Sequence, residues 1–155
     1  MPLEIKSVEK TDVTKGLTGK LGIVFTKEEP ECVEADMPLD PTLYQPFGFV
    51  HGGATISLLE TVASRAAELS VDFSKERPFG IEVHVRHWKS AQKGVLHGRA
   101  TLDHMEGPKQ YWAVVATDDE GDVISQGTIV TKVVTLERLR EKEAKRAAKR
   151  AKAAE

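Results

Sequence analysis

Hydrophobic and polar residues change their spacing along this chain, from a period of two to a helical period and back. Between residues 53 and 70 apolar side chains recur every three or four positions, which is typical of one face of an amphipathic helix. That face comprises Ala54, Leu58, Leu59, Val62, Ala63, Ala66 and Leu69. The opposite stripe is polar and contains Ser57, Thr61, Ser64, Arg65 and Glu68. We therefore expect one long helix, with Glu60 on the border between its two faces.

On both sides of this helix the pattern is typical of strands. Before it, strands are expected over residues 21–26 and 32–37, and after it over 81–87, 95–104, 110–118 and 123–135. The last two are expected to form a hairpin closed by residues 119–122. One long helix among strands that pair antiparallel predicts an α+β domain, with a sheet wrapped around the helix.

Length and charge divide the chain into three segments. The 155 residues suffice for one domain, which we place at 21–135, after a weakly patterned segment 1–20 and before a charged tail 136–155. The tail has eight basic and four acidic residues and so carries a net charge of +4. Because the whole chain carries −2, residues 1–135 carry −6. An acidic body argues against a nucleic-acid-binding domain. The tail is rich in helix formers and is expected to be a solvated helix, with anionic ligands, lipids or a partner as alternatives.

Cysteine content and hydropathy indicate the compartment. Cys32 is the single cysteine, which excludes an internal disulfide and a multi-cysteine zinc site. The first residues form no apolar signal region, and no apolar run approaches the ~20 residues of a membrane span. We expect a cytoplasmic protein with no membrane span.

The segment Gln45-Pro46-Phe47-Gly48-Phe49-Val50-His51-Gly52-Gly53-Ala54 leads into the helix. Adjacent glycines let the backbone approach a ligand, and the first N–H groups of a helix are unpaired and favour negative charge. Such a place can hold an oxygen that becomes anionic in a transition state. The alternative is that the glycines only allow a tight turn into the helix.

Glu60 lies about 10–11 Å along the helix from these glycines, at 1.5 Å per residue. A substrate carbonyl could therefore reach both groups only if they came from different subunits. Glu60 is either a solvated border residue or a nucleophile or base. No Lys or Arg stands three or four positions away to form an ion pair with it. Ser64 follows one turn later, while Gln45 and His51 are further polar candidates.

The histidines do not predict a metal site. His84 and His87 differ by three positions and would face opposite sides of a strand. His87 shares a face with apolar residues, so it is either a satisfied core histidine or the wall of a pocket.

The motif from Gln45 to Ala54, together with Glu60 and Ser64, resembles the hotdog-fold acyl-CoA thioesterases. Within them it is similar to the 4-hydroxybenzoyl-CoA thioesterase branch, which has its catalytic Glu on the central helix, and most of all to the 1,4-dihydroxy-2-naphthoyl-CoA and phenylacetate-degradation types. The similarity continues through Gly80-Ile81-Glu82, His87, Gln110-x-Trp112 and Thr131, over about residues 20–134.

The resemblance implies a hotdog fold and a role for each residue of the motif. Glu60 would be the nucleophile or general base, and the Gly52 amide, helped by Gln45, would polarise the thioester carbonyl. His51 would hold the loop, Ser64 would assist the water, and Gly53 and His87 would line the substrate site. Lys89 and Arg86 are the expected contacts of the CoA phosphates, although relatives often have Arg at the position of Lys89.

The resemblance also implies partners and a reaction. The substrate would be an acyl-CoA, no cofactor or metal would be needed, and the clefts would lie between the subunits of a dimer that pairs again into a tetramer. An aroyl-CoA hydrolase is the leading hypothesis. A broad acyl-CoA hydrolase and a non-catalytic acyl-CoA sensor are the alternatives.

Overall fold

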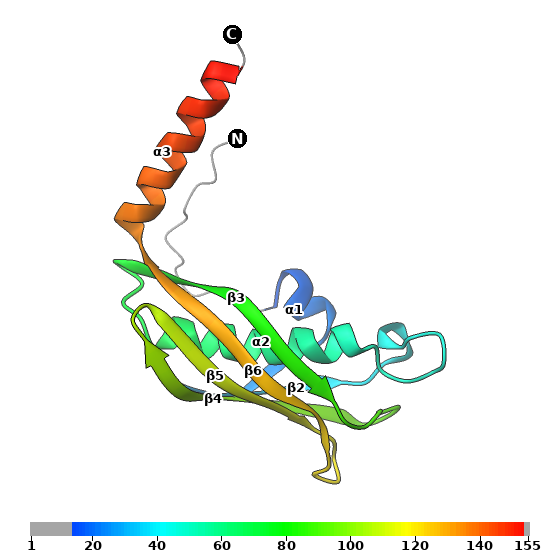
Figure 1. Ribbon diagram of the computed structural model, residues 1–155. Coiled ribbons are helices and arrows are strands. Elements are labelled where there is room, and N and C mark those ends of the chain that lie inside the picture. Colours follow the sequence, from blue (N-terminus) through cyan, green and yellow to red (C-terminus); the bar gives the residue numbers. More distant parts are fainter. Residues whose placement is uncertain (1–13, 154–155) are drawn as a thin grey trace.

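The computed structural model describes residues 14–153, which form one six-stranded antiparallel sheet and a long helix packed against it (Figure 1). In chain order the elements are α1 (Gly16–Lys20), β1 (Val24–Glu29), β2 (Cys32–Pro38), the short 3-10 helix η1 (Pro41–Leu43), α2 (Gly52–Leu69), β3 (Glu76–His87), β4 (Val95–Glu106), β5 (Lys109–Thr117), β6 (Val123–Thr135) and α3 (Leu136–Ala153). The strands are ordered β1-β2-β4-β5-β6-β3.

Helix α2 contacts all six strands and forms the centre of the core. Its apolar face is fully buried at Leu58, Leu59 and Val62, as the periodicity predicts. The sheet contributes side chains from alternate positions, including Trp112 and Ile129. The predicted architecture, an antiparallel sheet wrapped around one long helix, is confirmed.

Several boundaries differ from those expected. Strand β3 starts at Glu76 instead of 81, because its first part pairs with the end of β6, Glu76 opposite Thr135. Pro78 is tolerated there because β3 is an edge strand. At the other edge, β1 begins only at Val24, because the N–H groups of residues 21–23 bond to carbonyls of α1 and close the end of that helix, which packs on α2.

One face of the edge strand β3 carries exposed apolar side chains. Phe79, Ile81 and Val83 are 46%, 44% and 40% exposed. An open edge with apolar side chains is a surface on which a further strand can pair. This edge strand contacts α2, the helix that carries the candidate site residues, so a strand paired there would lie close to them.

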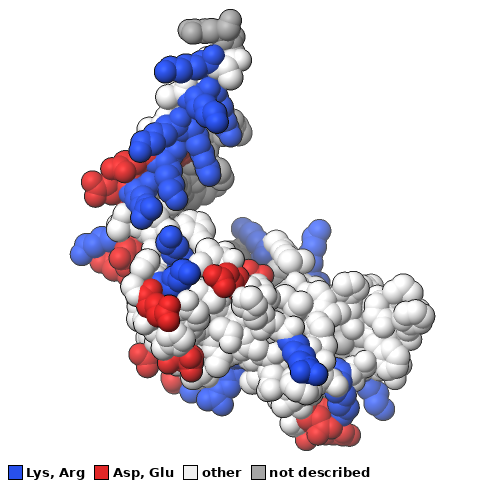
Figure 2. Space-filling view, viewed as in Figure 1, with Lys and Arg blue, Asp and Glu red and all other residues white. Residues whose placement is uncertain are grey.

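Helix α3 follows β6 without a loop and projects away from the body (Figure 1). It has no buried residue, and Figure 2 shows Lys and Arg side chains gathered along it. Of the helices in residues 14–153, none is long and apolar enough to cross a bilayer.

Candidate active site

The first turn of α2 is held by its own loop. His51 is the N-cap, and its Nδ1 accepts a hydrogen bond from the Gly53 N–H at 2.9 Å. Upstream, the Gln45 N–H donates to the Phe49 carbonyl at 2.8 Å, and Gln45 Oε1 accepts from the Phe47 N–H. Both contacts orient Gln45, and its amide NH2 remains available as a donor. His51 therefore joins the loop to the first turn of α2 through its ring.

The Gly52 N–H is the group that the loop leaves available. Within residues 14–153 it donates to no acceptor, whereas the N–H groups of Gly53, Ala54 and Thr55 all bond to His51. As the first residue of α2, Gly52 presents this donor at the positive end of the helix dipole. The arrangement suits an oxygen that gains negative charge.

The end of β3 closes one side of this donor. A Cβ on Gly52 would lie 2.8 Å from His87 Nε2, so the imidazole rests directly against the glycine. His87 Nδ1 is 2.7 Å from the Ser125 hydroxyl. His87 is thus part of a wall beside the helix start, rather than a core residue.

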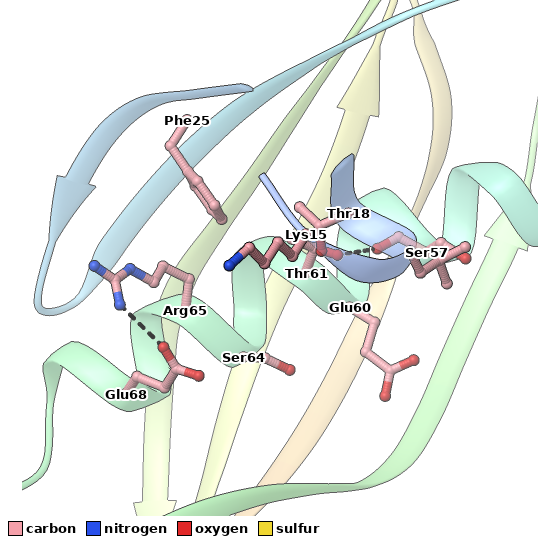
Figure 3. A pocket seen from close by; sticks show the side chains of 10 residues that line it. Lys15, Thr18, Phe25, Ser57, Glu60, Thr61, Ser64, Arg65 and Glu68 are labelled. Atoms are coloured by element: carbon pink, nitrogen blue, oxygen red, sulfur yellow. Dashed lines mark hydrogen bonds and ion pairs between the residues drawn. The ribbon is translucent and has the colours of Figure 1, made fainter. Parts of the chain in front are cut away.

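Glu60 lies apart from the helix start, two turns further along α2. A cavity of about 330 Å³ between α1, β1 and α2 is lined there by Glu60, Ser64 and Ser57, among others. Figure 3 shows the Glu60 and Ser64 side chains leaving α2 on the same side, away from Arg65. Arg65 is paired with Glu28 at 2.7 Å and Glu68 at 3.0 Å.

The Glu60 carboxylate is half-buried and makes no hydrogen bond or ion pair with the residues described, 14–153. It lies against the backbone of β3, because a Cβ on Gly80 would be 2.9 Å from Glu60 Oε1. A carboxylate in this state is available to attack a carbonyl or to take a proton from water.

Within one protomer these two places do not meet. Gly52 and Glu60 are eight residues apart on α2, about 12 Å at ~1.5 Å per residue, and they contact different ends of β3, Glu60 at Gly80 and Gly52 at His87. The structure thus brings Glu60 together with Ser64, and Gly52 with Gln45, His51, Gly53 and His87, in two separate groups.

The cations expected at the CoA phosphates have other contacts. Lys89 Nζ bonds Asp122 at 2.6 Å and Asp118 at 3.1 Å, and these carboxylates raise its pKa to about 12. The Arg86 guanidinium lies 4.2 Å from the centre of the exposed Trp88 ring. Asp118, Glu120 and Asp122 are the one described group of carboxylates close enough to hold a metal, and Lys89 bonds two of them.

Two residues at the site could not be identified from spacing. In the sequence Gly80 is visible only as part of a motif, because its contact with Glu60 depends on how β3 crosses α2. Ser125 lies 38 residues from His87, and only the β3–β6 register places them opposite each other. If the register between the two strands could be predicted from the sequence, it would place Ser125 opposite His87.

Comparison with known proteins identifies the family. Residues 47–125 match the family model of the thioesterase superfamily. The chain is 33% identical over 105 residues to the proofreading thioesterase EntH of Klebsiella pneumoniae, covering 68% of this chain and 76% of the relative. It is 30% identical over 118 residues to the 1,4-dihydroxy-2-naphthoyl-CoA hydrolase of Escherichia coli, covering 76% and 86%.

The solved structures agree with this assignment. A mutant of the thioesterase PA1618 from Pseudomonas aeruginosa superposes with a TM-score of 0.76 at 30% identity, covering 80% of this chain and 89% of the other. The thioesterase HI1161 from Haemophilus influenzae gives 0.75 at 26% identity, covering 80% and 86%. The chain therefore belongs to the thioesterase superfamily, with the hotdog fold, and is a thioester hydrolase.

Proposed function

We propose that this protein hydrolyses an aromatic acyl-CoA, in a site where Gly52 of one protomer faces Glu60 of a second copy. The observation that carries the proposal is the pair of incomplete groups, an unpaired N–H at the start of α2 and an unpaired carboxylate two turns later. The aromatic acyl group is supported by relatives such as the 1,4-dihydroxy-2-naphthoyl-CoA hydrolase of Escherichia coli. A CoA thioester as substrate favours a cytoplasmic enzyme.

The free edge of β3 supports the two-protomer site. Antiparallel pairing of two β3 strands around Val83 and His84 would bring Gly80 of one copy opposite His87 of the other. Because Gly80 adjoins Glu60 and His87 adjoins Gly52, each such pairing would join one carboxylate to one helix start. It would also cover Ile81 and Val83 and leave no open edge there. Further pairing of such dimers into a tetramer is compatible with this arrangement.

Chemistry in this site follows from the groups present. The thioester carbonyl oxygen would accept hydrogen bonds from the Gly52 N–H and the Gln45 amide, which stabilises the charge that develops on it. Glu60 would attack the carbonyl carbon or remove a proton from an attacking water, with Ser64 orienting that water. If Glu60 acts as the base, the oxygen of water bonds to the carbonyl carbon, the C–S bond breaks, and the proton taken from water passes to the sulfur of CoA. If Glu60 attacks directly, its carboxylate forms an anhydride with the acyl group as the C–S bond breaks, and a water then cleaves the anhydride, which frees Glu60 and supplies the proton for the sulfur. The products are the free acid and CoA.

For the CoA moiety, the exposed end of β3 offers Arg86 and, beyond it, Lys89. A guanidinium can bond a phosphate while it remains stacked on an aromatic ring, so Arg86 over Trp88 is compatible with this role. Lys89 would have to share its ammonium group with Asp118 and Asp122. We therefore expect Arg86 to contribute more to CoA affinity than Lys89.

The decisive experiment measures free-CoA release from benzoyl-, hydroxybenzoyl-, dihydroxynaphthoyl- and straight-chain acyl-CoA. Wild type is compared with Glu60→Gln and, as a control for loss of one carboxylate, with Glu120→Gln in the β5–β6 turn. We expect aroyl-selective turnover that falls roughly 10³-fold or more in Glu60→Gln and stays unchanged in the control. Turnover that is indifferent to Glu60 would refute the proposed chemistry. Equal rates on straight-chain substrates would indicate a broad hydrolase, and binding without turnover would indicate a sensor.

A further inference from the structure

Ser125 supports the imidazole beside Gly52 from inside the sheet. It lies on β6 directly opposite His87 in the β3–β6 register, and its side chain is fully buried. Its hydroxyl oxygen is 2.7 Å from His87 Nδ1, a short contact for this type of hydrogen bond.

The direction of this hydrogen bond follows from what else Ser125 can reach. Among residues 14–153, His87 Nδ1 is the single hydrogen-bond partner of the Ser125 hydroxyl. A buried hydroxyl whose hydrogen has no acceptor costs about 1–3 kcal/mol, so the hydroxyl donates and Nδ1 accepts. A neutral imidazole that accepts at Nδ1 carries its proton on Nε2.

The resulting N–H lies beside the free donor of the helix. His87 Nε2 is 2.8 Å from the position of a Cβ on Gly52, the residue whose backbone N–H is unpaired. Two donors therefore converge on the space at the start of α2. Glu60 and Ser64 lie in the other group, two turns or more along α2, so within a protomer the base is kept apart from the donors.

We propose that Ser125 is a positioning residue, which fixes His87 as the Nε2–H tautomer so that it donates to an oxygen of the thioester bound at the start of α2. The contact with substrate rests on the proposed function, whereas the tautomer is a property of the protein alone. His87 then serves as a donor and not as a second base. A hydroxyl at position 125 is needed for this role, since alanine has no group that could donate a hydrogen bond to Nδ1.

The first test is the tautomer in the ligand-free protein. Long-range ¹H–¹⁵N spectra of ¹⁵N-histidine-labelled protein distinguish a protonated from an unprotonated ring nitrogen. We expect His87 to be protonated at Nε2 alone in wild type and in the control Ser70→Ala, and to show a mixture of tautomers in Ser125→Ala. An Nδ1–H form of His87 in wild type would overturn the proposal, whether or not any variant folds.

The second test is kinetic and includes a double-mutant cycle with His87→Ala. We expect kcat on the best aroyl-CoA to fall about 10-fold in Ser125→Ala, since a misaligned donor loses part of the stabilisation of a full one, with KM little changed. Ser125→Thr, which keeps the hydroxyl, should restore most of kcat. In the His87→Ala background the Ser125→Ala change should have no further effect, because Ser125 acts through His87. An equal loss in both backgrounds would refute the positioning role.

The two tests separate the two proposals. If the Nε2–H tautomer is observed but no thioester is hydrolysed, the proposed function fails and the assignment of Ser125 stands. If thioesters are hydrolysed but His87 carries its proton on Nδ1, the assignment of Ser125 fails and the proposed function stands.

Discussion

The two ends of β3 differ in how far their polar groups are already satisfied. At the His87 end the side chains are fixed by hydrogen bonds, His87 to Ser125 at 2.7 Å and His51 to Gly53 at 2.9 Å. At the Gly80 end the Glu60 carboxylate lies against a glycine and has no partner in the described part of the chain. Under the proposed function, the first end would hold the oxygen of the substrate and the second would supply the reactive carboxylate.

The difference between the two ends of β3 agrees with the two tasks that the proposed reaction sets, stabilising an oxygen and supplying a base or nucleophile. Donors that stabilise a transition state work best when they are fixed beforehand, because no reorganisation is then needed during the reaction. A nucleophile or base must instead be free to form a new bond or accept a proton. Gly52 and Glu60 are eight residues apart on α2, about 12 Å at ~1.5 Å per residue, so within a protomer the Gly52 N–H and the Glu60 carboxylate cannot satisfy each other by a hydrogen bond.

The largest expected effect is a recovery of activity from two inactive variants. Glu60→Gln removes the carboxylate, and Gly52→Ala places a Cβ 2.8 Å from His87 Nε2, so each homodimer should lose roughly 10²-fold or more in kcat/KM. A mixed dimer isolated with two different tags has one site carrying both changes and one carrying neither. It should regain about half of the wild-type activity per dimer. A mixed dimer as inactive as its parents would place both ends of the site in the same protomer.

A charge on the free edge of β3 should separate the two ends. Val83→Glu puts a carboxylate in the middle of the apolar edge, so we expect monomers by light scattering and a roughly 30-fold loss of activity. Because Val83 is 40% exposed, the melting temperature of the protomer should change little. The matched control is Val24→Glu on β1, the other edge strand, where Val24 is 61% exposed. Dimers that survive Val83→Glu would argue for a different interface.

Gly80→Ala tests the carboxylate end alone. The new methyl group would be 2.9 Å from Glu60 Oε1, and the flexible end of the side chain would shift by a few tenths of an ångström. We expect kcat to fall about 10-fold, because small displacements of a reacting group are costly, while the protein remains folded. In the Glu60→Gln background the same change should cost nothing more, and an additional loss there would mean that Gly80 matters for another reason.

A smaller effect concerns stability outside the site. His97 bonds Asp36 at 2.7 Å and Asp119 at 2.9 Å, and these two carboxylates raise its pKa. The stabilisation is fully present below the unfolded pKa of about 6.5 and is lost as the pH rises through the folded pKa. Since the His97 side chain is 41% exposed and solvent screens the pair, His97→Gln should cost at most about 1 kcal/mol.

Denaturant melts at several pH values would test this expectation. The difference in unfolding free energy between wild type and His97→Gln should be largest near pH 6 and disappear by about pH 9, given the ordinary pKa of histidine. A difference that grows with pH would contradict the charged His97 bridge.

The smallest effect is expected from the tail. Ending the chain after Thr135 removes α3, which has no buried residue. Rates on acyl-CoA substrates should change less than about twofold at physiological salt, where the Debye length is about 8 Å. A much larger change in KM would show that the tail contacts the substrate.

The sequence sufficed for the elements with clear periodicity and for the position of the helix start. Helix α2, its buried face and the β5–β6 hairpin follow from spacing alone, and the Gly-Gly step correctly indicated a free N–H at a helix start. The first part of β3 was not predicted, because Glu76, Arg77 and Pro78 do not alternate. That part is a strand because it pairs with the end of β6.

The remaining features depend on contacts between distant parts of the chain. The Gly80 contact requires the path of β3 over α2, and Lys89 bonds carboxylates about thirty residues away in the β5–β6 turn. Periodicity describes faces of single elements, whereas these pairs depend on register and crossing. The catalytic roles of Glu60, Ser64 and Gln45 stay predictions until the variants are measured.

The straight continuation of β6 into α3 gives the molecule a permanent electric dipole. Eight basic and three acidic residues lie on a rod about 27 Å long, at 1.5 Å per residue, while residues 1–135 carry a net −6. An anionic molecule diffusing toward the protein is thus attracted first to the tip of the rod and repelled by the body. At low ionic strength, encounters with anions will be oriented before any contact forms, and added salt will remove that bias.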